Sequence, residues 1–232
     1  MSAPGASGQL VSVIVPAYEA QEYLEEALRS ALAQDHGEVE IVVVDDGSTD
    51  RTAEIALACG VRVLRQRNAG PAAARNAGLA VARGAFVTIL DADDVWPADR
   101  LSSQLAYLRE HPEVGIVMGL TEVFLTPGQE RPAHDPRFAE GEQVTGHPAT
   151  MLVRREVFEL VGGFDESLRL SEDIDWLARA GDAGVRSGRV DRTLLRYRIH
   201  AGNNSRDTQA NHAATLSVLR ASVARKRSRI GV

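Results

Sequence analysis

The sequence predicts an α/β fold built on a mostly parallel central sheet. Short apolar runs alternate with stretches of helical periodicity through the first half of the chain. Continuous apolar runs are typical of strands buried on both faces, and helices between them favour right-handed crossovers between parallel strands. Polar segments directly follow three of these runs, at Pro16–Glu19, Asp45–Asp50 and Asp91–Asp94. Because ligands bind beyond the carboxyl ends of parallel strands, we expect these segments to share one binding edge.

The first half predicts four strands separated by helices. The expected strands are Leu10–Val15, Glu40–Val44, Val61–Leu64 and Phe86–Leu90. The expected helices are one with Leu24, Ala27, Leu28, Ala31 and Leu32 on one face, then Thr52–Ala58, then Pro71–Ala82. Pro71 suits a first helical position, and the alanines after it have high helix propensity. Pro97 is expected to open another helix, with Leu101, Leu105 and Leu108 on one side.

The second half is less regular. Val114–Leu125 predicts one long strand or a strand pair, and Ala149–Val153 predicts a strand before a short helix that ends at Val161. Ser171 is a candidate N-cap for a helix that runs to about Ala180.

A long loop and a terminal helix complete the expected elements. Thr126–Pro148 contains four prolines and shows no clear period. Structureless loops of this length are usually functional lids or disordered segments, and we hypothesise that this one closes over a bound ligand, with a plain surface insertion as the alternative. Asp207–Arg229 predicts a helix with Leu216, Leu219 and Val223 on one face. Its basic end is interpreted as cations near a helix C-terminus, and a membrane or partner patch stays open as an alternative.

Composition and charge narrow the class of protein. The chain has 232 residues, of which 44% are hydrophobic, and this length allows one large α/β domain or two small ones. Its only cysteine is Cys59, which excludes an internal disulfide and favours a reducing, cytoplasmic compartment. The net charge of -6 argues against nucleic acid as the main partner. The apolar runs are too short for transmembrane segments, and residues 1–9 are interpreted as a flexible tail without signal-peptide features.

The acidic cluster Asp91-Ala92-Asp93-Asp94 predicts a metal site. The two commonest phosphate-binding fingerprints, a Gly-rich loop ending in Gly-Lys-Ser/Thr and Gly-x-Gly-x-x-Gly, are missing from the sequence, so a nucleotide would need another source of positive charge. Clustered carboxylates repel one another unless a cation lies between them. Mg²⁺ binds few protein carboxylates and fills its other positions with water and phosphate oxygens, and Mn²⁺ is the other candidate. The alternative is a polar turn that leads into the next helix.

Four motifs occur in a characteristic order along the chain. They are Val11-Ser-Val-Ile-Val-Pro-Ala-Tyr18, Val42-Val-Val-Asp-Asp-Gly-Ser-Thr-Asp50, Asn68-Ala-Gly-Pro-Ala-Ala-Ala-Arg-Asn-Ala-Gly78 and Leu90-Asp-Ala-Asp-Asp94. This set resembles the inverting glycosyltransferases of family 2, which have the GT-A fold. The similarity continues at Gly162–Glu166, Glu172-Asp173 and Tyr197–His200, so it spans about Leu10 to Ser205. It implies a Rossmann-like sheet flanked by helices, with a nucleotide-binding half at 10–95, an acceptor half at 96–205 and a C-terminal helix at 206–232.

The resemblance also implies roles for single residues. Pro16, Tyr18 and Glu19 would border the nucleoside, and Asp46 would accept a hydrogen bond from the base. Arg75 would approach the nucleotide, Asp91 the ribose, and Arg198 the diphosphate. Asp93 would bind the metal, assisted by His200. Without the resemblance, a turn role for Asp46, a solvated helix face for Arg75 and a structural role for His200 are alternatives.

Asp173 is the expected general base, and Glu172 is the rival candidate. Both would lie at the start of a helix, where the helix dipole stabilises carboxylates and keeps their pKa low. Catalysis by Asp173 would then depend on its position against the acceptor hydroxyl.

The resulting hypothesis is a metal-dependent, hexosyltransferase-type enzyme that inverts the anomeric centre. Its donor would be a nucleotide-diphosphate sugar, UDP-linked by default, and its cofactor Mn²⁺ or Mg²⁺. The acceptor would be a hydroxyl of unknown class, and contact with the inner face of a membrane stays open. The alternatives are a nucleotidyltransferase that forms nucleotide sugars, which the lack of a Gly-rich loop after the first strand disfavours, and a non-catalytic sugar-nucleotide-binding protein.

Overall fold

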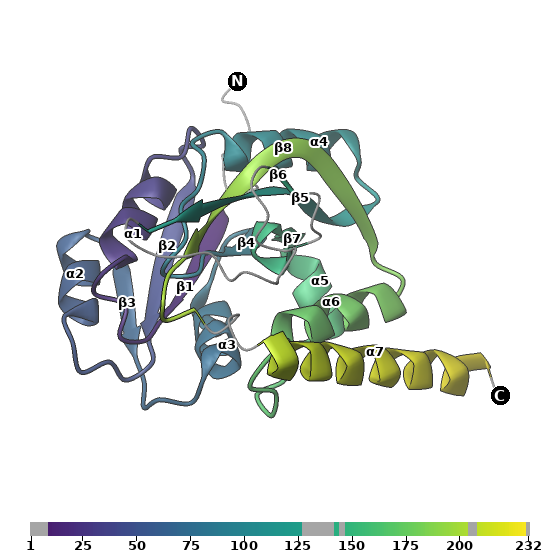
Figure 1. Ribbon diagram of the computed structural model, residues 1–232. Coiled ribbons are helices and arrows are strands. Elements are labelled where there is room, and N and C mark those ends of the chain that lie inside the picture. Colours follow the sequence, from purple (N-terminus) through teal and green to yellow (C-terminus); the bar gives the residue numbers. More distant parts are fainter. Residues whose placement is uncertain (1–8, 127–141, 144–146, 204–207, 231–232) are drawn as a thin grey trace, which may run out of the picture.

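A mixed sheet of eight strands lies at the centre of the molecule (Figure 1). The computed structural model describes residues 9–126, 142–143, 147–203 and 208–230. The sheet order is β3-β2-β1-β4-β7-β5-β6, with β8 paired to β5. The strands are β1 (Val11–Ala17), β2 (Val39–Asp45), β3 (Arg62–Arg65), β4 (Phe86–Ile89), β5 (Val114–Leu125), β6 (Glu142–Gln143), β7 (Leu152–Arg154) and β8 (Arg186–Ile199). The helices are α1 (Leu24–Leu32), α2 (Thr52–Ala58), α3 (Pro71–Val81), α4 (Arg100–Glu110), α5 (Arg155–Val161), α6 (Glu172–Asp182) and α7 (Thr208–Ile230).

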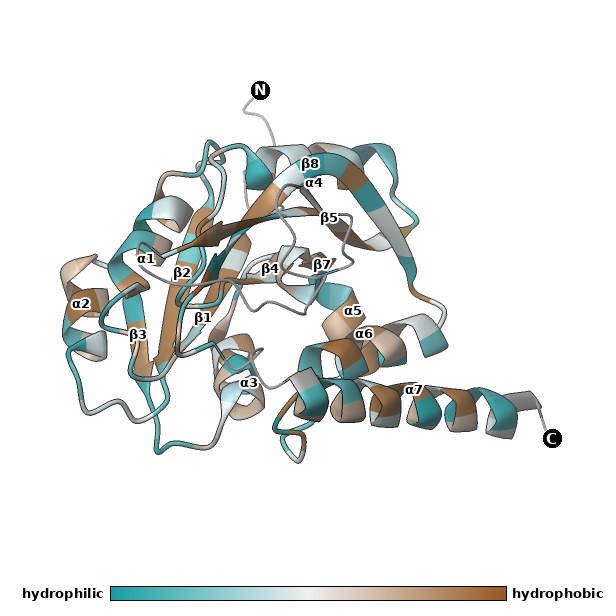
Figure 2. Ribbon diagram, in the orientation of Figure 1, coloured by the Kyte–Doolittle hydropathy of each residue, from teal (hydrophilic) through white to brown (hydrophobic). Residues whose placement is uncertain are grey.

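Strand β1 organises the parallel half of the sheet. It pairs in parallel with β2 on one side and with β4 on the other. Its alternate residues enter two cores: Val13 packs with α1 and α4 on one face, whereas Ile14 packs with α3, α5 and α6 on the other. Both faces of the strand are therefore apolar, which explains its continuous hydrophobic run and its brown colour in Figure 2. The carboxyl ends of β1, β2 and β4 all point to the same edge.

The sequence predictions hold best in this parallel half. Helix α2 spans the predicted residues, and strands β1 to β4 begin or end within two residues of their predicted bounds. The prediction of a mostly parallel α/β sheet flanked by helices is confirmed. Val114–Leu125 forms one long strand rather than a pair. Strand β8, which pairs in parallel with β5 along most of that length, was not predicted.

Three local predictions were wrong. The helix expected at Pro97 begins three residues later as α4, because Pro97 and the two residues after it form a turn closed by a hydrogen bond from the Arg100 amide to the Pro97 carbonyl (3.2 Å). The strand expected at Ala149–Val153 begins with a 3-10 helix at Pro148–Thr150 before β7. Ser171 precedes α6 as expected, but its backbone is left-handed (φ 61°) and its side chain makes no capping bond.

The predicted loop Thr126–Pro148 lies mostly outside the described residues, as do residues 1–8. The loop-closure hypothesis therefore stays a prediction, and so does the division of the chain into two functional halves. The predicted terminal helix is present as α7. None of the described helices is long and apolar enough to span a bilayer.

Gly78 sets how closely α3 packs on the sheet. A Cβ atom at this position would collide with the Ile14 side chain of β1 and would crowd Val44 of β2. Ile14 is fully buried, so it has no room to move away. The missing side chain thus lets α3 approach the sheet and brings Arg75, one turn earlier in the helix, to the edge where the strands end.

We predict that Gly78→Ala lowers the free energy of unfolding by about 1–3 kcal/mol, the usual cost of overpacking a core. Gly181→Ala is the matched control, because Gly181 also lies within a helix but has open space around its Cα. The control should gain up to about 1 kcal/mol from helix propensity. Urea denaturation of both variants measures the difference, and equal stabilities would contradict the packing role of Gly78.

Candidate functional site

A cavity of about 1180 Å³ opens at the carboxyl ends of β1, β2 and β4. Its walls also come from the start of α6, the segment after β8 and the first turns of α7. The predicted site residues that line it are Pro16, Tyr18, Glu19, Asp46, Arg75, Asp91, Asp93, Glu172, Asp173 and His200. Residues that the sequence predicted for the site, and that lie as much as 184 residues apart from Pro16 to His200, therefore line the same cavity.

The acidic cluster after β4 divides into two exposed carboxylates and one buried carboxylate. The side chains of Asp91 and Asp93 are each 30% exposed and face the cavity. Asp94 is fully buried and accepts a hydrogen bond from the Arg198 amide (2.9 Å). Burial, followed by the charges of Asp93 and Asp91, raises the pKa of Asp94 well above its ordinary value. The first two carboxylates thus face the cavity, whereas the third belongs to the protein interior.

Asp93 is held by two groups from the far end of the chain. Its Oδ2 lies 2.8 Å from Nε2 of His200 and 3.2 Å from Nδ2 of Asn203. Oδ1 of Asn203 accepts a hydrogen bond from the His200 amide (2.6 Å), and the His200 ring packs on Tyr23 with centroids 4.6 Å apart. These contacts fix the directions of the Asp93 carboxylate and of the His200 imidazole at the cavity wall.

This pair fits the donor set of a divalent cation that binds together with phosphate. Among the described residues, no three His, Cys, Asp or Glu side chains form a complete protein ligand set. Mg²⁺ and similar cations commonly take only one or two carboxylates, and water and phosphate oxygens fill the other positions. Asp93 would offer such a cation a carboxylate and His200 an imidazole nitrogen, with Asn203 as the group that orients both.

Arg75 connects the acidic cluster to α6. Its guanidinium is buried and forms ion pairs with Asp91 (3.1 Å) and with Glu172. Burial alone would lower the pKa of Arg75, but the charges of Asp91, Glu172 and Asp173 outweigh it and raise that pKa. Burial raises the pKa of Glu172. The positive charge of Arg75 opposes this shift, and the negative charge of Asp173 adds to it. Because Glu172 forms an ion pair with Arg75, its carboxylate is already engaged by a cation.

Asp173, the next residue, is only partly buried and faces the cavity. Its Oδ1 accepts a hydrogen bond from the Ile174 amide (2.7 Å) in the first turn of α6. This bond orients the carboxylate at the helix N-terminus. Of the two neighbouring acids, Glu172 forms an ion pair with Arg75 and Asp173 does not.

Asp46 shapes the cavity wall through the backbone. Its two carboxylate oxygens accept hydrogen bonds from the Gln66 side chain (2.7 Å) and from the amides of Ala69 (2.9 Å) and Gly70 (2.8 Å). Asp46 therefore holds the segment that leads into α3 and still borders the cavity. Its expected contact with a nucleotide base stays a prediction.

Beside Asp46, Glu19 accepts hydrogen bonds from the amide and hydroxyl of Thr49, both at 2.9 Å, which join the segment after β1 to the segment after β2. Pro16 precedes this segment at the end of β1, and Tyr18 is 54% exposed at the cavity. An exposed aromatic ring at a cavity is suited to stack on a planar ligand.

The structure does not bring the Arg198 side chain into the cavity. Its guanidinium is buried, donates to the carbonyl of Asp93 (2.8 Å) and forms an ion pair with Glu26. It also lies over the rings of Tyr23 (4.9 Å) and Phe124 (4.6 Å). These contacts support the acidic cluster from behind, so the expectation that Arg198 lies near a bound diphosphate finds no support in this geometry.

Two residues that line the cavity, Asn203 and Arg169, were not predicted from the sequence, and neither was the role of Asn76, which follows Arg75. Asn203 holds Asp93, Asn76 joins two motifs, and Arg169 is an exposed cation at the cavity. Asn76 donates to the Phe164 carbonyl (2.9 Å) and accepts from the Phe164 amide (2.8 Å). The sequence signal for Asn76 is its place between Arg75 and Gly78 in the motif Asn68–Gly78.

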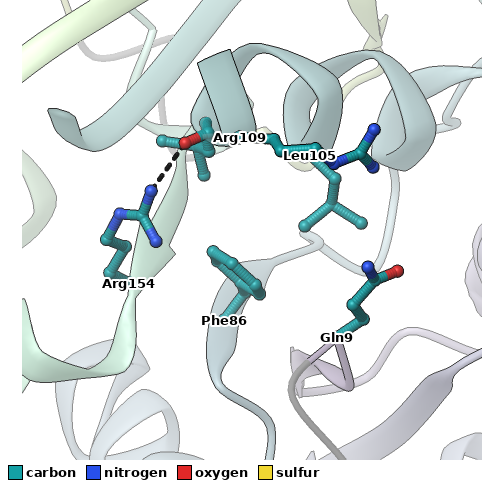
Figure 3. A pocket seen from close by; sticks show the side chains of 6 residues that line it. Gln9, Phe86, Leu105, Arg109 and Arg154 are labelled. Carbon is teal, nitrogen blue, oxygen red and sulfur yellow. Dashed lines mark hydrogen bonds between the residues drawn. The ribbon is translucent and has the colours of Figure 1, made fainter. Parts of the chain in front are cut away.

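A second, smaller cavity lies at the opposite edge of the sheet (Figure 3). It has a volume of about 190 Å³ and is lined by Gln9, Phe86, Leu105, Leu108, Arg109 and Arg154. Arg154 donates to the carbonyls of Leu108 (2.7 Å) and Val114 (2.9 Å), so its charge is used in packing. This cavity has no carboxylate among its lining residues and is not the candidate site.

Comparisons with known proteins find glycosyltransferases among the similar sequences. An uncharacterized glycosyltransferase of Rickettsia felis is 30% identical over 205 residues, which cover 84% of this chain and 34% of that protein. The chain thus spans about a third of that relative's length.

Two solved structures share the fold. S. aureus TarS 1-349 in complex with UDP-GlcNAc matches with a TM-score of 0.73 at 24% identity, over 94% of this chain and 66% of that one. The mannosyltransferase PcManGT from Pyrobaculum calidifontis, in complex with GDP-Man and Mn²⁺, matches with a TM-score of 0.68 at 24% identity. The match covers 90% of this chain and 64% of that one. The expected GT-A fold is therefore confirmed.

The family model for Glycosyl transferase family 2 matches residues 12–162. This range holds the four ordered motifs, the acidic cluster and Arg75, and it ends just before the Gly163–Glu166 contacts with Asn76. The predicted family is therefore confirmed: the chain belongs to glycosyl transferase family 2.

Proposed function

We propose that the chain transfers a sugar from a nucleotide-diphosphate donor to an acceptor hydroxyl, with inversion at the anomeric carbon and with a divalent metal ion. One observation carries this proposal. Asp93, at the end of β4, and Asp173, at the start of α6, face the same cavity from two different elements. The first carboxylate suits a metal and the second suits a general base.

The charges of the lining residues support metal dependence. The acidic residues of the cavity wall are Glu19, Glu22, Asp46, Asp91, Asp93, Glu172 and Asp173. Among the described lining residues, the arginines are Arg75, which is already paired with acids, and Arg169. A diphosphate is itself negatively charged, so its binding here requires added positive charge. The complex of PcManGT with GDP-Man and Mn²⁺ is consistent with Mn²⁺, and Mg²⁺ would serve the same role.

In this proposal, a cation held by Asp93 and His200 would stabilise the negative charge that develops on the departing nucleoside diphosphate. Asp173 accepts the proton of the acceptor hydroxyl. The hydroxyl oxygen bonds to the anomeric carbon on the face opposite the diphosphate, and the bond from that carbon to the diphosphate oxygen breaks. The ion pair between Arg75 and Glu172 joins α3 to α6 and fixes the two sides of the cavity relative to each other. Tyr18 and Asp46 border the nucleoside, and the TarS complex with UDP-GlcNAc is consistent with uridine as the default base.

The first prediction concerns the metal. Asp93→Ala should weaken binding of a nucleotide-diphosphate sugar and remove its response to Mn²⁺, because the carboxylate that holds the cation is lost. Isothermal titration calorimetry with and without EDTA measures this effect. Asp191→Ala is the control, because Asp191 is 77% exposed and does not line the cavity. Donor binding by the native protein that is unchanged in EDTA would refute metal dependence.

A second prediction concerns the group behind the metal pair. Asn203→Ala removes the amide that orients Asp93 and His200, so the Mn²⁺ concentration at half-maximal donor binding should rise about 10-fold. Circular dichroism checks that the variant stays folded. The same Mn²⁺ midpoint in a folded variant would show that Asn203 does not position the pair.

A third prediction separates the two acids of α6. Asp173→Asn should reduce turnover about 10²–10⁴-fold with donor affinity changed only a few-fold, because the amide cannot accept the acceptor proton. Glu172→Gln should lower the free energy of unfolding by about 1.5–3 kcal/mol, because it weakens the charged hydrogen bond to buried Arg75. Turnover, donor affinity and thermal unfolding of both variants are compared. If Glu172→Gln shows the pure turnover defect and Asp173→Asn does not, the base is Glu172.

A further inference from the structure

Helix α7 carries a concentrated positive charge on an otherwise acidic chain. Its basic residues are Arg220, Arg225, Lys226, Arg227 and Arg229, and the segment Thr208–Ile230 contains no Asp or Glu. The whole chain nevertheless has a net charge of -6. Figure 1 shows α7 alongside α6, with its C-terminal half extending beyond the rest of the molecule.

One face of α7 is committed to α6. Val218 and Ser222 are buried at this contact. The Ser222 hydroxyl donates to Asp182 (2.7 Å), and Arg225 forms an ion pair with the same carboxylate (2.7 Å). The inner face of α7 thus already has its partner.

The opposite face combines apolar side chains with unpaired arginines. Leu216, Leu219 and Val223 are 53%, 50% and 50% exposed, and their spacing of three and seven residues places them on one side of a helix. Arg220 and Arg227 follow Leu216 by four and eleven residues, so they share this side, and both are exposed. Within the described part of the chain, neither arginine forms an ion pair. Figure 2 shows the resulting alternation of brown and teal along α7.

We propose that this outer face docks on the surface of an anionic phospholipid bilayer. Clustered arginines attract anionic headgroups, and their long aliphatic stems let the guanidinium groups reach the headgroups while the neighbouring leucines and valine contact the edge of the acyl chains. The charge disfavours a second copy of the chain, because two basic helices would repel. It also differs from a nucleic-acid surface, because α7 has no Phe, Tyr or Trp for base stacking, and a phosphate backbone gives no partner to the leucines.

The position of α7 gives the docking a consequence for the cavity. Asn211 and Thr215, in the first turns of α7, line the cavity wall, and the Thr215 hydroxyl lies 3.3 Å from that of Ser171 at the start of α6. A bilayer bound along the outer face of α7 would therefore lie next to one rim of the cavity. The docking itself rests on α7 alone and does not depend on the proposed reaction.

Vesicle sedimentation tests the proposal. The full chain should sediment with vesicles of equal parts phosphatidylglycerol and phosphatidylcholine at low salt, bind much less at high salt, and not bind pure phosphatidylcholine. Arg220→Gln with Arg227→Gln should weaken binding about 25-fold, on the scale of about fivefold for each basic residue at an anionic surface. Leu216→Ser with Leu219→Ser should also weaken binding, because it removes the apolar contact.

Matched variants elsewhere on the surface serve as controls. Leu32→Ser with Leu57→Ser removes two leucines that are 53% and 64% exposed on α1 and α2. Arg62→Gln with Arg109→Gln removes two exposed arginines on β3 and α4. Both controls should bind the anionic vesicles like the native protein. Equal losses in the control and α7 variants would refute docking by this face.

A spectroscopic readout tests whether the face enters the bilayer boundary. Brominated phospholipids should quench the fluorescence of Val223→Trp, whereas the native Trp96 and Trp176 are buried and should be little affected. No quenching together with no sedimentation would overturn the proposal. Concentration-dependent dimerisation that Leu216→Ser with Leu219→Ser abolishes, without vesicle binding, would instead assign the face to a second copy.

Discussion

The arrangement of the site depends on one buried cation, the guanidinium of Arg75. It lies between Asp91 at the end of β4 and Glu172 at the start of α6, and it stacks 5.6 Å from the Phe164 ring. A buried charge is tolerated only when opposite charges and hydrogen bonds compensate for its lost hydration. Here the two carboxylates do so, and each of them lines the cavity. The same ion pairs that stabilise the interior therefore fix the distance between the acidic cluster and the start of α6.

The mixed half of the sheet supplies the groups that contact Asp93. Strand β8 runs in parallel beside β5 and returns the chain to the carboxyl end of β4, where Arg196 forms a bridge with Val95. His200 and Asn203 follow this strand directly and reach Asp93. A carboxylate that is oriented by two such groups loses less entropy when a cation binds. The register of β8 is thus a condition for the geometry at Asp93.

The sequence predicted what local patterns encode and missed what distant contacts create. The strand β1 was predictable because both of its faces are apolar. The strand β8 was not, because charged residues interrupt Arg186–Ile199 and much of it is exposed. Ten of the predicted site residues line one cavity, because the resemblance supplied their order along the chain. The contact of Asn203 with Asp93 spans 110 residues, and the burial of Arg198 depends on Glu26, so neither follows from a local motif.

Three buried arginines hold the acidic cluster and the segment that follows it. Arg75 binds the Asp91 carboxylate, and Arg198 binds the Asp93 carbonyl and, through its amide, Asp94. Arg100 stacks on Trp96 at 3.9 Å and donates to the carbonyls of Ala149 and Leu194, which ties the segment after the cluster to the sheet. None of these contacts uses the Asp93 carboxylate. The backbone of the cluster is therefore fixed, while the carboxylate that faces the cavity keeps its capacity for a ligand. This is the preorganisation that a binding site requires, because little reorganisation remains to be done when the ligand arrives.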